Sequence, residues 1–206
     1  QEVFQLDEYD NWSLVEKAPI GSPEEQLFRA EKFLTDGKIE ECLDLTSRWI
    51  ERFNDHPLLP NAYLLRGDAK DANGNEYEAL YDYEFLIRSF PNHETFVTAN
   101  ERELNIGIRY ASGLKKRAFG IRFVSAVDEA VELMIRVQER LPRSQLAEKA
   151  CMALGDYYFS TQQVRLASKT YEIFLQNFPK STNQTKALRR LIFAQLAGYR
   201  GPNYND

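Results

Sequence analysis

Small and aromatic residues recur along the chain at a fixed spacing, and this pattern predicts most of its structure. One set of four is separated by 12, 4 and 8 residues: Gly67, Ala79, Tyr83 and Pro91. The same residue types recur at the same intervals in a second set: Gly155, Ala167, Tyr171 and Pro179. Weaker matches to this frame start at Ala30 and Ala118. The chain is therefore expected to repeat a structural unit of about 34 residues.

Each unit is expected to form two antiparallel helices. Small residues suit the place where the two helices cross closely, because a larger side chain would push them apart. A proline ends the second helix, because it lacks the amide hydrogen and clashes with the preceding turn. The pattern predicts helices at residues 23–36, 38–54, 58–73, 76–90, 94–112, 123–140, 143–161, 163–177 and 181–197.

Two segments depart from the repeat. Residues 1–22 mix apolar and acidic side chains without helical periodicity, and we expect an extended arm whose apolar groups pack against the first helices. The alternative for this arm is a detachable binding segment. Pro91 and Pro142 are 51 residues apart, which is more than one repeat, and the extra length predicts an inserted basic loop at about residues 113–122.

The repeating unit resembles the tetratricopeptide repeat. Small residues stand at its eighth and twentieth places, an aromatic residue at the twenty-fourth and proline at the thirty-second. The resemblance implies an all-α fold, a superhelix (α-solenoid) of about four helix pairs plus a terminal helix. Residues 1–22 would then be the extended N-terminal arm and residues 23–206 the repeat domain.

Composition and charge indicate the type of secondary structure and exclude one class of partner. Leu and Ala outnumber Ile and Val by 41 to 18, which favours helices over strands. The formal net charge is −5. An acidic chain is a poor nucleic-acid binder, because attraction to phosphates needs a basic face, so no nucleic-acid partner is expected.

Catalytic, cofactor-binding and metal-binding residues are not expected. His56 and His93 each lie beside a repeat-ending proline and are interpreted as loop residues. Cys42 and Cys151 lie in helical patterns, without a CxxC partner or an adjacent histidine, which favours small buried side chains. The sequence also lacks a glycine-rich phosphate loop and a nucleophile elbow. The chain is therefore expected not to be an enzyme.

A helical array offers a concave surface for partners. In tetratricopeptide repeats, the residue after the small one at the eighth place faces this groove. In the three repeats whose register is clearest, this residue is acidic: Glu31, Asp68 and Asp156. The acidic stripe favours a ligand with basic or amide-rich groups, and the alternative is that these are ordinary exposed helix positions. Further contacts in the groove are expected from apolar residues that could equally belong to the core: Leu64, Met152 and Phe159.

The inserted segment and the end of the helix before it hold a compact basic cluster, made of Arg109, Lys115, Lys116, Arg117 and Arg122. Such a cluster could meet an acidic partner domain or anionic lipid headgroups. The alternative is a solvated loop that keeps the insertion soluble. Aromatic residues within the cluster favour a docking element, because mixtures of arginine and aromatic side chains are enriched at interfaces.

The ends of the repeats point to a particular family. Residues 88–92, 141–144 and 177–181 resemble the repeat ends of BamD-like outer-membrane assembly lipoproteins and of their periplasmic YbgF/CpoB-type relatives. The segment from Gly155 through Tyr157-Tyr158-Phe159 to Tyr171 is similar to the same group. The likeness covers roughly residues 23–200. Its motifs are structural, so no partner-binding residue of the family can be transferred to this chain.

This resemblance implies a non-catalytic scaffold of the outer-membrane β-barrel assembly machinery, on the periplasmic face of a Gram-negative outer membrane. Its partners would be a barrel assembly subunit with periplasmic domains and unfolded outer-membrane proteins. Contact with the membrane would come only through a lipid anchor outside this chain. The alternative is a soluble periplasmic adaptor of cell-wall synthesis or of the Tol system.

Overall fold

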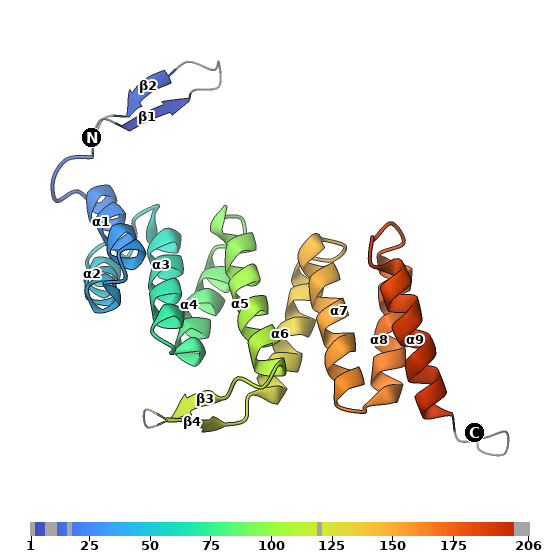
Figure 1. Cartoon of the computed structure of the whole chain (residues 1–206). Helices are drawn as coiled ribbons and strands as arrows, with labels where there is room; N and C mark the ends of the chain where they lie inside the picture. The colour runs from blue at the N-terminus through green and yellow to red at the C-terminus, as the bar shows by residue number, and fades with distance from the viewer. Residues whose placement is uncertain (1–2, 7–11, 16–17, 119–120, 200–206) are drawn as a thin grey trace. The chain divides into compact units, whose positions relative to one another are not determined.

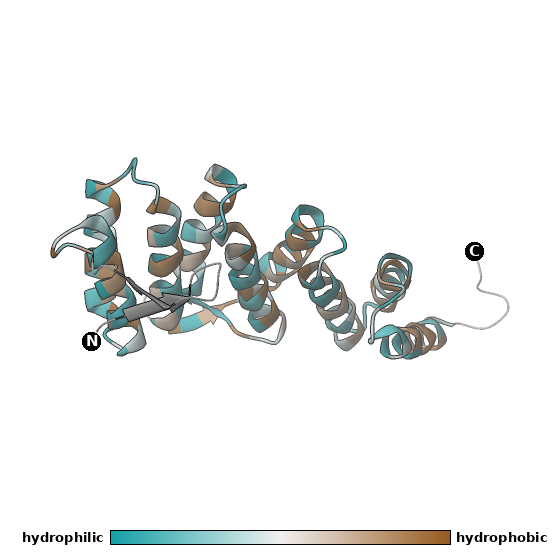
Figure 2. Cartoon of the chain, turned by 90° about the horizontal axis from the view of Figure 1, so that it is seen from above, coloured by the Kyte–Doolittle hydropathy of each residue, from teal (hydrophilic) through white to brown (hydrophobic). Residues whose placement is uncertain are grey.

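The computed structural model describes residues 3–6, 12–15, 18–118 and 121–199, which belong to two compact units that divide at residue 96. Within these ranges the fold is all-α apart from two short hairpins, and the nine expected helices are present (Figure 1). Figure 2 shows that the helices carry both hydrophilic and hydrophobic residues, as expected for elements that pack on one side and meet water on another. The fold is a tetratricopeptide-like helical repeat.

Unit 1 contains two pairs of helices, α1 (Pro23–Thr35), α2 (Ile39–Arg52), α3 (Leu59–Ala72) and α4 (Glu76–Ser89). Each helix packs against the next along the chain. Helix α1 begins at Pro23 because the Ser22 hydroxyl accepts a hydrogen bond from the backbone N–H of Glu25, 3.2 Å away. Trp49 of α2 is almost fully buried, and its indole N–H donates to the carbonyl of Pro23 at 2.9 Å.

The predicted extended arm at the start of unit 1 pairs with itself. Strands β1 (Val3–Leu6) and β2 (Trp12–Val15) form an antiparallel hairpin in which Val3 is opposite Val15 and Leu6 is opposite Trp12. The expected packing of the arm's apolar side chains against the first helices lies outside the described residues.

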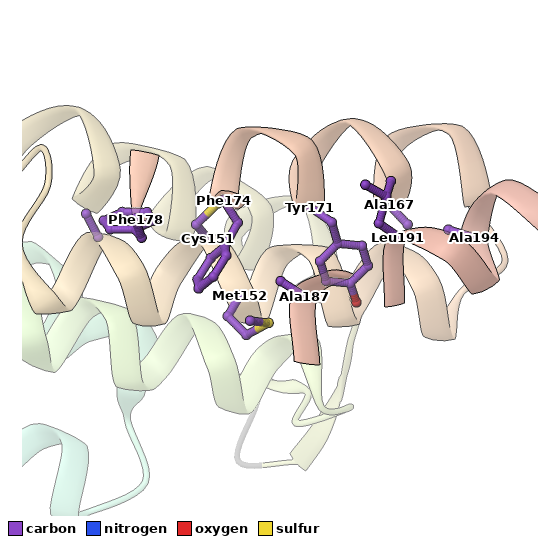
Figure 3. Packing of buried hydrophobic residues seen from close by; sticks show 10 residues of the cluster. Cys151, Met152, Ala167, Tyr171, Phe174, Phe178, Ala187, Leu191 and Ala194 are labelled. Atoms are coloured by element: carbon purple, nitrogen blue, oxygen red, sulfur yellow. The ribbon is translucent and has the colours of Figure 1, made fainter. Parts of the chain in front are cut away.

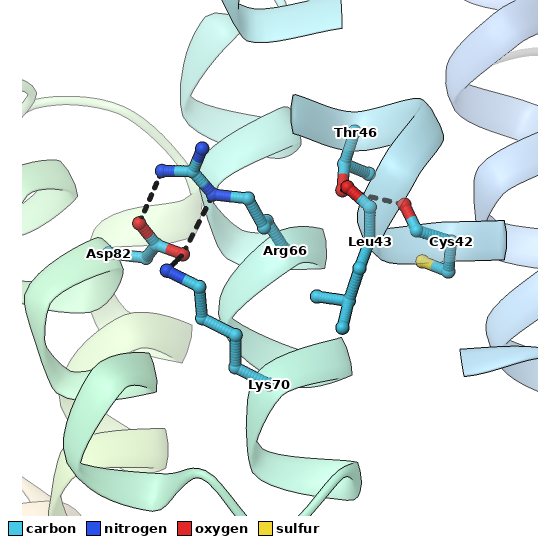
Figure 4. A network of polar contacts seen from close by, with 6 residues as sticks. All are labelled: Cys42, Leu43, Thr46, Arg66, Lys70 and Asp82. Atoms are coloured by element: carbon cyan, nitrogen blue, oxygen red, sulfur yellow. Dashed lines mark hydrogen bonds and ion pairs between the residues drawn. The ribbon is translucent and has the colours of Figure 1, made fainter. Parts of the chain in front are cut away.

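Helices α3 and α4 are joined by a buried ion network (Figure 4). The Asp82 side chain, 4% exposed, accepts hydrogen bonds from Nε and Nη2 of Arg66 at 2.9 and 2.6 Å. Nζ of Lys70 lies 2.8 Å from Oδ2 of the same carboxylate. The Arg66 guanidinium also lies over the Tyr63 ring, 5.1 Å from its centroid. One buried carboxylate of α4 thus neutralises two cations of α3 and links the two helices of this pair.

Unit 2 begins at Val97, two residues into α5 (Thr95–Ala111), and contains the remaining helices of the described chain, α6 (Val127–Arg140), α7 (Gln145–Ser160), α8 (Val164–Asn177) and α9 (Gln184–Gly198). Helix α5 is tied to α6 by an ion pair between Glu103 and Arg140 at 2.7 Å. Helices α6 to α9 then pack in chain order. The core that α7, α8 and α9 share gathers around Cys151, Tyr171 and Phe174, which are fully buried (Figure 3).

The insertion in unit 2 is a β-hairpin rather than the predicted loop. Strands β3 (Lys116–Ala118) and β4 (Ile121–Val124) pair in antiparallel register. The helix expected from residue 123 therefore begins four residues later, at Val127. The reason is local: residues 121–124 read Ile-Arg-Phe-Val, in which two β-branched residues and one aromatic residue have high strand propensity.

Contacts of the glycines at the eighth place explain why glycine and tyrosine recur together in two repeats. A Cβ atom on Gly67 would lie 2.5 Å from Cε1 of Tyr83, and one on Gly155 would lie 2.7 Å from Cε1 of Tyr171. Both tyrosine rings are fully buried. The aromatic residue at the twenty-fourth place thus occupies the space that the glycine leaves open, which is why these two positions recur together.

Candidate functional site

Two of the predicted groove carboxylates accept hydrogen bonds from the repeat tyrosines. The Tyr83 hydroxyl donates to Oδ1 of Asp68 at 2.8 Å, and the Tyr171 hydroxyl donates to Oδ1 of Asp156 at 2.7 Å. Burial, followed by the hydrogen bond to Asp156, raises the pKa of Tyr171 far above its ordinary value, so the hydroxyl keeps its proton and stays a donor. Each carboxylate therefore also holds the two helices of its own pair together.

The other predicted groove residues lie in different environments. Glu31 is exposed on α1, and Leu64 is partly buried on α3. Met152 is 7% exposed and belongs to the core of unit 2, the second of the two possibilities that its sequence position allowed. Phe159 is partly exposed at the end of α7. Partner binding by these residues stays a prediction.

Within unit 2, Phe159 lines a groove between α7 and α9, and Asp156 contacts two of the cations that line it. Lys186 Nζ of α9 is 3.1 Å from Oδ2 of Asp156, and Arg190 Nε is 3.9 Å from Oδ1. The Arg190 guanidinium lies over the Phe159 ring, 5.2 Å from its centroid. Beside these contacts the α7–α9 groove opens, with a volume of about 690 Å³, and is lined by Phe159, Thr182, Thr185, Lys186, Arg189, Arg190 and Phe193.

Sequence reasoning missed the three cations of this groove, Lys186, Arg189 and Arg190. A signal for them was present. Arg190 follows Asp156 by 34 residues, one full repeat. It therefore occupies in the last repeat the ninth place that is acidic in three earlier ones. Lys186 is one helical turn earlier, on the same face of the helix. Extending the frame by one repeat would have predicted that the charge of the stripe reverses at α9.

The basic cluster predicted in the insertion is largely carried by the β3–β4 hairpin. Lys116 forms an ion pair with Glu129 of α6, which ties the hairpin to the helix that follows it. Arg122 donates to the Lys115 carbonyl at 2.9 Å, and Arg117 is opposite Arg122 in the register. The last member, Arg109, is partly buried on the last turn of α5, the helix that leads into the hairpin.

The hairpin also exposes apolar side chains: Phe123, an aromatic residue of the predicted cluster, and Ile121, which the prediction did not include. On β4, Ile121 is 67% exposed and Phe123 is 55% exposed, while the intervening Arg122 is partly buried. Alternate residues of a strand point to opposite faces, so Ile121 and Phe123 share one face. A hairpin with an apolar face and neighbouring cations is typical of a docking element.

The side chains considered for chemistry are held in structural contacts. Burial raises the pKa of the Cys151 thiol to about 12, and burial together with the Asp68 carboxylate raises the pKa of Cys42 to about 11. The His56 ring lies edge-on to Trp49, and its Nδ1 accepts the N–H of Leu58 at 3.1 Å. That the chain is not an enzyme stays a prediction.

In the described ranges, His, Cys, Asp and Glu side chains do not gather in groups of three that could hold a metal ion. Every described helix is too short or too polar to cross a bilayer.

No family model matches the sequence, and no curated protein matches it. The chain is similar to the solved structure "MamA 41-end from Desulfovibrio magneticus RS-1", with 18% identity, a TM-score of 0.49 and 84% of each chain covered. It is also similar to "MamA RS-1 ArsTM double mutant", with 14% identity and a TM-score of 0.48, over 85% of this chain and 93% of that one. The helical-repeat fold follows from the helix pairs themselves, and such a fold supports protein partners in general.

Proposed function

We propose that this chain is a non-catalytic scaffold of outer-membrane β-barrel protein assembly. It would bind partner subunits of the assembly machinery, unfolded outer-membrane proteins, or both, through its repeat surface. It would act at the periplasmic face of a Gram-negative outer membrane, held there by a lipid anchor outside this chain. A barrel subunit with periplasmic domains is the principal partner in this proposal.

The observation that carries the proposal is the repeat architecture, which offers open surfaces of mixed character. The α7–α9 groove combines cations with aromatic rings, and the β3–β4 hairpin exposes Ile121 and Phe123 beside arginines. Surfaces of this composition suit protein partners, because aromatic and arginine side chains are enriched at interface centres. The choice of outer-membrane assembly among scaffold functions rests on the resemblance of the repeat ends at residues 88–92, 141–144 and 177–181.

Site-specific photo-cross-linking in the native envelope tests the proposal. A benzophenone amino acid replaces Phe193 in the α7–α9 groove, or Phe123 on the hairpin, because both side chains are aromatic and about half exposed. Ile173 on α8 serves as the control position outside both surfaces. Cross-linked chains are isolated in mild detergent and identified by mass spectrometry.

We expect cross-links from Phe193, Phe123 or both to a barrel protein with periplasmic domains, and none from Ile173. Recovery of cell-wall synthesis or Tol components alone would overturn the assembly function. That result would assign the chain to the soluble periplasmic adaptors instead.

A further inference from the structure

The α7–α9 groove carries positive charge on an acidic protein. The chain as a whole has a net charge of −5, yet three cations line this groove, in Lys186, Arg189 and Arg190. The neighbouring carboxylate of Asp156 is paired with Lys186 and lies near Arg190. One carboxylate against three cations leaves a local charge of +2. A ligand in this groove therefore meets a positive surface, opposite to the one that the acidic stripe alone would present.

The groove also offers apolar contact between its charges. Arg190 lies over the Phe159 ring at one side, and Phe193, 52% exposed, contributes a second ring one turn further along α9. Thr182 and Thr185 add hydroxyl groups at the N-terminal end of α9. Arginine held against an aromatic ring is pre-organised, so less side-chain entropy is lost when it binds a carboxylate. The volume of about 690 Å³ is within the range of ligand-binding sites.

We infer that the α7–α9 groove binds an acidic peptide segment of a partner protein, with its carboxylates on Lys186, Arg189 and Arg190 and an apolar side chain between Phe159 and Phe193. Arginine forks and lysine match carboxylates as charge-assisted donors, and the aromatic walls suit a neighbouring leucine or phenylalanine. This inference rests on the proposed scaffold function and specifies the chemistry of its partner.

Fluorescence anisotropy with defined peptides tests the inference. The first probe is the labelled octapeptide Gly-Asp-Glu-Phe-Asp-Glu-Leu-Gly, and the second replaces every acid by its amide, as Gly-Asn-Gln-Phe-Asn-Gln-Leu-Gly. We expect the acidic peptide to bind at least about tenfold more tightly, because a hydrogen bond to a charged group contributes enough for that factor. Its affinity should fall as salt is added, since exposed charges are screened. Equal affinity for the two peptides would overturn the inference.

Charge-reversal variants locate the binding. Lys186→Glu and Arg189→Glu change exposed side chains, so both proteins should fold, and each should weaken the acidic peptide at least about tenfold. Lys169→Glu makes the same change of net charge at an exposed position on α8, outside the groove, and should leave the affinity within about twofold of wild type. Equal losses in the control and groove variants, or no loss in either groove variant, would refute the assignment.

The Asp156→Asn variant gives a result of opposite sign. Asparagine can still accept the Tyr171 hydrogen bond, but it removes the negative charge beside the cations. We expect the acidic peptide to bind this variant more tightly than it binds the wild-type protein. Weaker binding of the acidic peptide would contradict the inference. If the groove instead bound a basic ligand, removal of the Asp156 charge would weaken the binding of that ligand.

The outcome is separable from that of the cross-linking experiment. If the acidic peptide does not bind but Phe193 or Phe123 still cross-links to a barrel subunit, only the inferred ligand of the groove is refuted. If the acidic peptide binds but no such cross-links form, only the proposed role in outer-membrane protein assembly is refuted.

Discussion

The contact between Gly155 and Tyr171 allows a quantitative test of the repeat packing. In a Gly155→Ala variant the new Cβ atom would lie 2.7 Å from Cε1, 3.0 Å from Cδ1 and 3.1 Å from Cζ of the ring. Favourable carbon contacts begin at about 3.5 Å, so the ring or the helix must move. Tyr171 has little room to do so, because its ring is fully buried and its hydroxyl is held by Asp156 at 2.7 Å.

Two effects of opposite sign set the magnitude for Gly155→Ala. Overpacking of a well-filled core costs about 1–3 kcal/mol. Alanine is the better helix former by about 1 kcal/mol, which offsets part of that cost. We therefore expect the free energy of unfolding to fall by about 1 kcal/mol, measured by urea denaturation followed by circular dichroism. The closer approach of 2.5 Å at Gly67 predicts a larger loss for Gly67→Ala in unit 1.

A second background isolates the steric contribution. In Tyr171→Leu protein the ring is absent, so Gly155→Ala should there increase stability, by up to about 1 kcal/mol from helix propensity alone. The two effects of the same substitution should thus differ in sign. If Gly155→Ala changes stability equally in both backgrounds, or stabilises the wild-type protein, then the tyrosine ring is not what keeps this position small.

Three further predictions concern buried or paired ionisable groups. Asp82→Asn should lower the free energy of unfolding, measured by urea denaturation, by about 3 kcal/mol, because Arg66 and Lys70 then lose the carboxylate that neutralises both. A change below about 0.5 kcal/mol would contradict a stabilising role of the ion network. Burial raises the pKa of Cys151 to about 12 and contributes to the raised pKa of Cys42, so both thiols should react with Ellman's reagent only as the protein unfolds, and rapid labelling of the native protein would contradict this. Burial alone would raise the pKa of Glu129, but the hydrogen bond from Lys116, a backbone hydrogen bond and the charge of Lys116 together outweigh burial and lower the pKa below its ordinary value. The stabilisation by charged Glu129 is therefore present above the unfolded pKa and lost as pH falls through the folded one, so the difference in melting temperature between wild type and Glu129→Gln should close between pH 7 and pH 3.

The helices could be predicted from sequence because their boundaries are set by local chemistry. Ser22 and Pro23 fix the start of α1, and a proline follows soon after α4 and after α8. The β3–β4 hairpin could not be predicted in the same way. Its strands are three and four residues long, and a run such as Ile-Arg-Phe-Val fits the start of a helix as readily as a short strand when only periodicity is considered.

The candidate site was only half predictable, because a groove is a property of two helices and the sequence pattern describes them singly. The repeat frame predicted Asp156 of α7 as a groove residue, which stays a prediction, but the charge of the surface beside Asp156 depends on α9. Arg190 occupies the place that is acidic in three earlier repeats, and it meets Asp156 only because α7 and α9 carry successive copies of that place. Ligand preference in a helical array is therefore fixed by neighbouring repeats taken together. A stripe of like residues predicts it only as far as the stripe continues.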